Sequence, residues 1–332
     1  MAHSKQVVAI AGSGNIAQYL AEEFTRDQTH KVIVISRTDQ GFFRTLGITS
    51  QKLDQYSKDN ILPILDQTNA TVLVSTLHTD DPESYTSVHG ALLEACRGSK
   101  FCKRMIPSEF LGNSRDFRNV PRGIQRARHS FRSTLADQSD VQWTRVNGGW
   151  LADYFVQLPD GTRSYIKPFP QGWPIDLQQK TVRLIGTGDE PVSWTAARDI
   201  AKAVVKLVSY DDWDSHTWVF GELGTWNQAI EKVERFHGVE LKVIQLQQVA
   251  ILGFILTMRQ RSYVTRDTLD QDLAREEEDA VWYTATIDEW SLTGATAVPH
   301  QEALQQRDKY FKDVHFRNID DLLQDSKSME II

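Results

Sequence analysis

The chain has 332 residues, of which 40% are hydrophobic and 24% are charged, and its formal net charge is -7 at pH 7. This length fits one large domain, or a large domain with a smaller appended portion, in an ordinary globular protein. The negative charge gives no reason to expect nucleic acid or an anionic membrane as a partner, and two cysteines provide neither a disulfide framework nor, by themselves, a metal site.

The first residues, MAHSKQ, lead directly into an apolar run and show no signal-peptide pattern. The longest apolar run, Val249 to Leu256, is far shorter than the roughly 20 residues that span a bilayer. We therefore expect a cytoplasmic protein without a membrane span.

The stretch from Gln6 to Gln18 (QVVAIAGSGNIAQ) predicts a buried strand, a glycine-rich loop and the start of an amphipathic helix. Gly12 permits the sharp turn, Gly14 permits close approach of the backbone to a ligand, and the small Ala17 lets the helix pack on the strand. Because a helix N-terminus offers unpaired amides, this loop is expected to hold the pyrophosphate of a dinucleotide rather than to be an ordinary turn. The residues assigned to this contact are Gly12, Ser13, Gly14, Asn15 and Ile16.

The second strand, Lys31 to Ser36, ends where NAD-specific proteins usually carry an Asp or Glu that binds the ribose hydroxyls. Here Ser36 is followed by Arg37, with Arg44 a few residues further on. A planar guanidinium matches phosphate oxygens in pairs, so Arg37 is predicted to hold a 2′-phosphate and the cofactor to be NADP(H). The alternative is that Arg37 is a solvated loop arginine.

Strands and helices then alternate, which predicts an α/β fold: a Rossmann-type doubly wound parallel sheet with right-handed crossovers. Further strands are expected at residues 48–53, 70–77, 103–106 and 141–146, and helices at 85–96 and 125–136. In such a sheet, ligands lie at the carboxyl ends of the strands. The residues there that are assigned to the cofactor are Asp54, Ser75, Thr76 and Pro107.

Beyond Trp150 the chain becomes rich in proline and aromatic residues. Strands are expected at 181–185 and 218–220, helices at 197–208 and 228–236, and a closing strand and helix at the end of 301–323. We place an NAD(P)-binding domain at residues 1–150, with 180–235 partly returning to it. A smaller, mixed α/β substrate-binding portion takes residues 151–179 and 236–332.

Three segments resemble the NmrA-like branch of the atypical short-chain dehydrogenases, the group that contains the isoflavone reductase-like enzymes. They are the loop Gly12 to Ala17 followed by Ser36 and Arg37, the sequence RMIPSEF at 104–110, and the sequence WTRVNGGWLADYF at 143–155. The resemblance covers most of the chain. It implies a cytosolic NADPH-dependent reductase of small aromatic or polyketide-like molecules, in fungi often within secondary-metabolite pathways, although some members are non-catalytic regulators that bind dinucleotide.

One departure from this family concerns a lysine. In the reductases it stands near the nicotinamide, on the helix after Pro-Ser-Glu-Phe, and handles the proton on the substrate oxygen. Here that helix, GIQRARHSFRSTLAD, contains no lysine, and the family position falls at or beside His129, with Arg128 and Ser130 as neighbours. Histidine exchanges protons near neutral pH, so His129 is predicted to be the general acid/base, whereas an arginine could only stabilise an oxyanion. The alternative is a surface histidine on a basic helix.

Ser108 and Glu109 are further catalytic candidates, because they follow a strand at the carboxyl edge of the sheet. They could contact the nicotinamide ribose or a catalytic water. The structural alternative is that Glu109 pairs with an arginine such as Arg104 or Arg132 and braces the site.

Several aromatic residues are predicted to contact a flat apolar substrate, although aromatic residues more often fill a core. They are Phe110 and the set Trp150, Tyr154, Phe155, Tyr165, Phe169 and Trp173, of which Trp150 and Tyr154 are best placed. His78 could approach the same cleft. Asp199 lies at an expected helix start, where an N-cap role explains it.

Three functions compete. The leading one is an NADPH-dependent reductase of an aromatic or polyketide-derived metabolite. The second is a redox-neutral isomerase, dehydratase, epoxide-rearranging or cyclising enzyme, which the missing lysine favours and the complete dinucleotide loop disfavours. The third is an NADP-binding regulator with a protein partner, which the aromatic-rich segment disfavours.

Overall fold

The computed structural model describes residues 5–38, 41–79, 81–158, 161–243, 263–275, 280–329 and 331–332. Within these ranges, none of the helices combines the length and the apolar character needed to cross a membrane. The apolar run Val249 to Leu256 lies outside the described residues.

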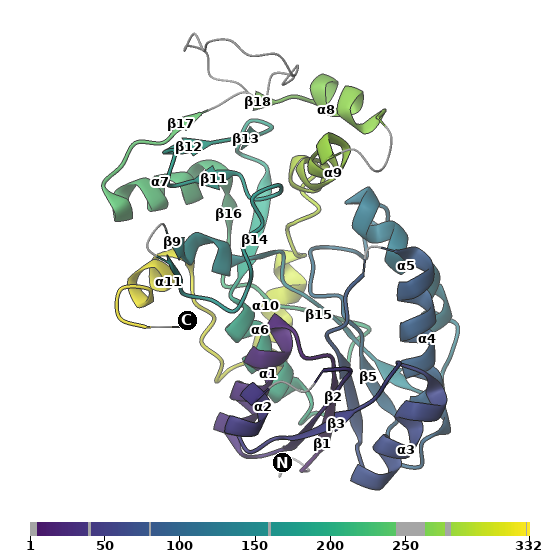
Figure 1. Ribbon diagram of the computed structural model, residues 1–332. Coiled ribbons are helices and arrows are strands. Elements are labelled where there is room, and N and C mark those ends of the chain that lie inside the picture. The colour runs from purple at the N-terminus through teal and green to yellow at the C-terminus, as the bar shows by residue number, and fades with distance from the viewer. Residues whose placement is uncertain are drawn as a thin grey trace.

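Six parallel strands form the central sheet, in the order β3-β2-β1-β4-β5-β6, and helices cover both of its faces (Figure 1). This strand order is that of the doubly wound Rossmann fold, so the predicted fold class is confirmed. The strands are β1 (Val7–Ala11), β2 (Lys31–Ser36), β3 (Thr49–Lys52), β4 (Val72–Ser75), β5 (Arg104–Ile106) and β6 (Gln142–Trp143). The connecting helices are α1 (Asn15–Asp27), α2 (Gly41–Thr45), α3 (Lys58–Thr68), α4 (Pro82–Gly98) and α5 (Arg122–Ala136).

Alternation of side chains along β1 explains the two helical layers. Val8 and Ile10 belong to the core that contains α1 and the later helix α6 (Ala197–Leu207). Ala9 and Ala11 belong to the opposite core, with α3, α4 and α5. All four side chains are fully buried, as expected for a central parallel strand covered on both faces.

The strand expected at 141–146 is interrupted at Thr144, and its second half is β7 (Arg145–Asn147). The Thr144 hydroxyl lies 2.8 Å from that of Thr217 and is buried. β7 pairs in parallel with β15 (His216–Trp218), a strand that comes about seventy residues later in the sequence. This pairing brings residues 147–150 to the carboxyl edge of the sheet.

The remaining elements form a smaller mixed α/β portion that lies above the carboxyl ends of the strands in Figure 1. Tryptophans dominate its core, and ring centroids lie 5.0 Å apart for Trp150 and Trp290 and 5.5 Å apart for Trp194 and Trp226. Its strands are β8 (Trp150–Leu151), β9 (Gln157–Leu158), β10 (Gly161–Thr162), β11 (Ile175–Asp176), β12 (Thr181–Val182), β13 (Leu184–Ile185), β14 (Pro191–Thr195), β16 (Glu222–Thr225), β17 (Lys242–Val243) and β18 (Tyr263–Val264). Its helical elements are the 3-10 helix η1 (Ala152–Val156), α7 (Trp226–His237), α8 (Arg266–Leu273), α9 (Ala280–Leu292) and α11 (Ile319–Asp325). The helix α10 (His300–Tyr310) packs instead against β15, and its Tyr310 belongs to the core that contains α1 and α6.

The closing strand expected near the C-terminus is wrong, because residues 311–318 form no strand. The Arg317 backbone N–H instead donates to Asp199 Oδ2 at 2.7 Å, and the Arg317 guanidinium pairs with the same buried carboxylate. The Asp199 side chain thus accepts the hydrogen bond from a backbone N–H group that would otherwise pair with a neighbouring strand. Asp199 is therefore not the N-cap of α6, which is Ala196.

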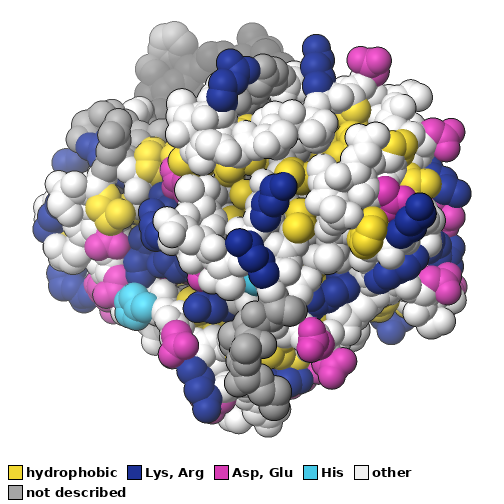
Figure 2. Space-filling model, turned by 90° about the horizontal axis from the view of Figure 1, so that it is seen from below, with side chains coloured by type: hydrophobic (Ala, Val, Ile, Leu, Met, Phe, Trp, Pro, Cys, Tyr) yellow, Lys and Arg dark blue, Asp and Glu magenta, His cyan; other side chains and the backbone are white. Residues whose placement is uncertain are grey.

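The face of the molecule seen from below, on the side of the N-terminus, carries Lys and Arg interspersed with Asp and Glu (Figure 2). Hydrophobic side chains are scattered among them in small groups. In the described part of that face, positive and negative side chains are therefore mixed, and no charge of a single sign covers it.

Candidate functional site

The glycine-rich loop connects β1 to α1 at the carboxyl edge of the sheet. Gly12 has φ +113°, a value that favours glycine, and a Cβ there would lie 2.4 Å from Thr76 Oγ1. Gly14 is exposed, and a Cβ there would meet nothing within 4 Å. Asn15 and Ile16 begin α1, and the fully buried Ala17 follows. The loop is thus fixed at Gly12 and open at Gly14, where the amides of the helix start face solvent.

Hydroxyl groups connect this loop to the end of β2. Ser36 Oγ donates to Ser13 Oγ at 2.8 Å, and the Thr38 backbone N–H donates to Ser36 Oγ at 3.2 Å. The first two strand ends are therefore held together by short polar side chains.

A hollow of about 330 Å³ lies beside these hydroxyls. Arg44 and Lys52 line it, together with Ser36, Thr38, Ile48, Thr49, Ser50 and Gln51. Arg37, the residue predicted to bind the 2′-phosphate, is exposed and is not among the residues that line the hollow. It lies near Tyr56: burial raises the pKa of Tyr56 to about 12, and the positive charge of Arg37 opposes this rise. Asp54 is exposed just beyond β3. The sequence analysis missed Lys52, although alternation along β3 places it on the same side as Ser50.

The residues after β4 have different surroundings. Ser75 is fully buried and its hydroxyl lies 3.0 Å from His89 Nε2 of α4, so it serves the packing of the domain. Thr76 Oγ1 donates to the Ala11 carbonyl at 3.1 Å and packs against Gly12. His78 is exposed, two residues further on. Of these three side chains, Thr76 and His78 lie where a ligand of the loop could reach them.

Pro107, Ser108 and Glu109 follow β5 and are buried. The Glu109 carboxylate forms a bidentate ion pair with Arg132 of α5, with Nε to Oε1 at 2.8 Å. Burial by itself raises the pKa of Glu109, but the Arg132 guanidinium outweighs this effect and holds the pKa below its ordinary value. Glu109 therefore has the bracing position that was the structural alternative.

The structure does not bring His129 to the sheet edge, and this position disfavours the predicted acid/base role. His129 is exposed and lines an outer hollow on α5 with Asn119, Arg126 and Ser130. The buried face of α5 carries Ile124, Ala127, Phe131 and Leu135. Arg128 lies within that stripe and His129 outside it, so the helix turns Arg128 inward.

Arg128 has only 3% of its surface exposed. Its Nη1 donates to the Ile124 carbonyl at 2.9 Å, and its Nη2 lies 3.2 Å from His78 Nδ1. The guanidinium carbon lies 5.0 Å from the ring centroid of Tyr85, and Nε is buried without a hydrogen-bond partner. A buried cation thus stands directly behind the exposed His78.

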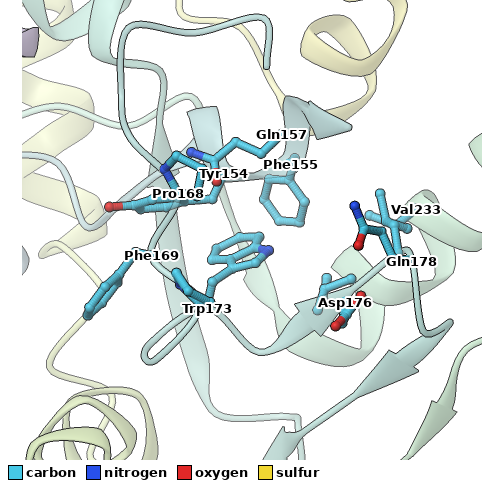
Figure 3. Close-up of a pocket in the computed structure, with 12 residues that line it drawn as sticks. Tyr154, Phe155, Gln157, Pro168, Phe169, Trp173, Asp176, Gln178 and Val233 are labelled. Carbon is cyan, nitrogen blue, oxygen red and sulfur yellow. The ribbon is translucent and has the colours of Figure 1, made fainter. Parts of the chain in front are cut away.

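An aromatic pocket of about 370 Å³ lies in the second portion (Figure 3). Tyr154 and Phe155 of η1 contribute one wall, and Trp173, with its ring centroid 4.8 Å from that of Phe155, contributes another. The other lining residues are Gln157, Pro168, Phe169, Pro170, Ile175, Asp176, Leu177, Gln178 and Val233. Of the aromatic residues predicted to contact a substrate, Tyr154, Phe155, Phe169 and Trp173 line this pocket, whereas Phe110, Trp150 and Tyr165 are not among its lining residues.

Trp150 and Phe110 have structural surroundings. Trp150 is buried in the tryptophan core, and its Nε1 donates to Ser291 Oγ at 3.3 Å. Phe110 is partly buried and packs against the core of the first domain, which also contacts Tyr154.

Backbone contacts connect the pocket to the sheet edge. The Asn147 side-chain amide donates to the carbonyls of Glu109 at 3.2 Å and Gly112 at 2.8 Å. The amides of Gly148 and Gly149 donate to the Leu111 carbonyl at 2.8 and 3.1 Å. The turn that leads to Tyr154 is therefore fixed to the loop after β5.

None of the available protein-family models matches the chain. An oxidoreductase of Arthroderma benhamiae, swnR, is 32% identical over 314 residues, which cover 94% of each chain. The swnR oxidoreductase of Metarhizium robertsii is 32% identical over 320 residues, which cover 95% of each chain.

Solved structures share the fold. Leucoanthocyanidin reductase from Vitis vinifera, in a ternary complex, has a TM-score of 0.69 at 18% identity, with 96% of this chain and 98% of that one covered. The protein AtPrR2, in a complex with NADP+ and (+)pinoresinol, has a TM-score of 0.68 at 17% identity, with 97% and 98% covered. The relatives identified by sequence, with the motifs and fold described above, show that the chain belongs to the NmrA-like, isoflavone reductase-like family of oxidoreductases.

Proposed function

We propose that the protein is an NADPH-dependent reductase that transfers hydride to a small flat molecule, aromatic or polyketide-derived. The observation that supports this most is the glycine-rich loop, which is open at Gly14 at the carboxyl edge of a parallel sheet. Hydrogen bonds from the Asn147 side-chain amide and from the backbone N–H groups of Gly148 and Gly149 connect the same edge to the turn that carries Tyr154. A reductase needs both a dinucleotide site and an apolar substrate site at one sheet edge.

The residues fit a phosphorylated dinucleotide. The loop from Gly12 to Ile16 would bind the pyrophosphate through its amides. Arg44 and Lys52 would bind the 2′-phosphate in the hollow beside Ser36 and Thr38, with Arg37 and Asp54 at its rim. Thr76 and Pro107 would lie along the nicotinamide end. The cofactor supplies the hydride, and the protein supplies its orientation.

The aromatic pocket would take the substrate. Its rings, Tyr154, Phe155 and Trp173, offer flat apolar surface, and Gln157 and Asp176 offer polar groups. The similar solved structures are named for reductases of ring-containing compounds, which supports this substrate class for the present chain. We include in the proposal a cytoplasmic location and a role in secondary metabolism, which flanking synthase and oxygenase genes would support.

The experiment is to incubate the purified protein with NADPH and a panel of quinones, enones and aromatic ketones. We expect consumption of NADPH matched mole for mole by reduced product. Product formation without NADPH consumption would replace the proposal with the redox-neutral alternative. NADPH binding without turnover of any compound would favour the regulator.

A further inference from the structure

We propose that His78, oriented by Arg128, stabilises the negative charge that forms on a substrate oxygen during reduction. This inference rests on the proposed reductase function and narrows its substrate class. The acceptor is then a ketone, aldehyde or enone, in which hydride addition to carbon leaves charge on oxygen.

His78 lies at the edge where the reaction would occur. It follows Thr76 and Leu77, and a Cβ built on Gly12 would lie 2.4 Å from Thr76 Oγ1 and 3.2 Å from Leu77 Cδ2. The segment after β4 is therefore in van der Waals contact with the dinucleotide loop. Because His78 is itself exposed, its ring is accessible from the ligand side of this contact.

The contact with Arg128 fixes which ring nitrogen carries the proton. A guanidinium has only donors, so at 3.2 Å from Arg128 Nη2 the Nδ1 atom of His78 must be the acceptor. In a neutral imidazole the proton then resides on Nε2. His78 consequently presents an N–H donor on the side of its ring away from Arg128.

Arg128 adds a buried positive charge beside His78. Its contacts are the Ile124 carbonyl, the Tyr85 ring and His78. The ion pair of Glu109, the acidic group on the neighbouring loop, is with Arg132, and Arg128 acts on Glu109 as a further nearby positive charge. The same buried positive charge would stabilise negative charge that forms beside His78.

The chemical step balances without a further redox partner. Hydride from NADPH forms a C–H bond at the carbonyl carbon, the C=O π pair moves to the oxygen, and NADP+ leaves. The oxygen accepts a hydrogen bond from His78 Nε2–H and takes its final proton from water. A donor held in place at a developing oxyanion stabilises the transition state.

Alanine and glutamine substitutions at His78 test the proposal, with His129→Ala as the matched control on the outer face of α5. His78→Ala should lower kcat with a ketone acceptor roughly 100- to 1000-fold, while the dissociation constant for NADPH stays unchanged. His78→Gln retains an N–H donor, so its kcat should fall much less than that of His78→Ala. His129→Ala should retain the wild-type rate. Arg128→Lys, which keeps the positive charge, should lower kcat less than Arg128→Met does.

Two results would overturn the proposal while leaving the reductase function in place. One is a His78→Ala variant that reduces a ketone at the wild-type rate. The other is a wild-type enzyme that reduces preformed cyclic iminium ions but no carbonyl compound, because their nitrogen loses positive charge and needs no anion stabilisation. If the wild-type protein consumed no NADPH with any of the acceptors tested, the proposed function would be refuted, and this inference with it.

Discussion

Gly12 and Thr76 are in such close contact that a Cβ on Gly12 would lie 2.4 Å from the Thr76 hydroxyl oxygen. The Thr76 backbone N–H and hydroxyl both donate to the carbonyl of Ala11, directly before Gly12. The shape of the dinucleotide loop therefore depends on the end of β4 as much as on its own sequence.

This contact predicts that one glycine substitution lowers stability and that the other weakens NADPH binding. Gly12→Ala places a side chain at φ +113° against Thr76 and should lower the free energy of unfolding by about 1–3 kcal/mol, measured by chemical denaturation. Gly14→Ala meets no atom within 4 Å and should leave stability unchanged, but it should weaken NADPH binding because the added methyl occupies the ligand side. Equal stability of the two variants would contradict this account of the loop.

The hollow beside β2 and β3 predicts which cation selects NADPH. Arg44→Ala should weaken NADPH binding roughly 10- to 100-fold, the value of one charge-assisted hydrogen bond, and leave NADH binding nearly unchanged. Titrations with both cofactors measure the ratio. Arg37→Ala is the comparison, because Arg37 is not among the residues that line the hollow. A larger effect there than at Arg44 would favour Arg37 as the phosphate-binding residue, as predicted from the sequence.

The ion pair between Glu109 and Arg132 predicts a pH-dependent stability. Because the folded-state pKa of Glu109 is depressed, its contribution is complete above the ordinary carboxylate pKa and is lost as the pH falls through the folded value. Glu109→Gln leaves Arg132 without its anionic partner and should cost about 3–5 kcal/mol at neutral pH. Its acid-unfolding curve should be flatter than that of the wild type, and an identical curve would show that the pair does not carry this dependence.

His89 predicts a second acid-sensitive term. Burial lowers the pKa of His89 to about 4, so in the folded protein the imidazole stays neutral where the unfolded chain already takes up a proton. Stability should therefore fall as the pH drops from about 6.5 towards 4, by about 1.4 kcal/mol per pH unit at most. Substituting His89 with Gln should remove this part of the curve, which denaturation at several pH values would measure.

The aromatic pocket predicts a separation of substrate binding from cofactor binding. Trp173→Ala should raise KM for a flat aromatic acceptor, because the ring lines the pocket, and should leave the NADPH dissociation constant unaltered. Phe101→Ala is the control, since Phe101 is 44% exposed and does not line the pocket. An unchanged KM in the Trp173 variant would place the substrate elsewhere.

The sheet could be predicted from sequence because its strands are short apolar runs and its loop carries positional glycines. Gly12 needed its positive φ and Gly14 its open face, and both requirements could be inferred from spacing. The break at Thr144 could not be inferred, since it depends on the pairing of β7 with β15, a contact between distant parts of the chain.

The site residues were harder to predict, because one residue of helix register decides which side chain faces inward. A signal was available: Ile124, Ala127, Phe131 and Leu135 mark the buried stripe of α5, and Arg128 lies within it. Trp150 followed the commoner behaviour of aromatic residues and entered a core. His78 stood out only when the structure showed Arg128 behind it.

The most direct test of the central claim follows the hydride itself. NADPH carrying deuterium at the nicotinamide C4 is incubated with the protein and an accepted ketone or enone, and the product is examined by mass spectrometry and NMR. The account predicts one deuterium on the former acceptor carbon of each product molecule, transferred from one face of the nicotinamide only. A product without deuterium, formed while the NADPH remains intact, would contradict it.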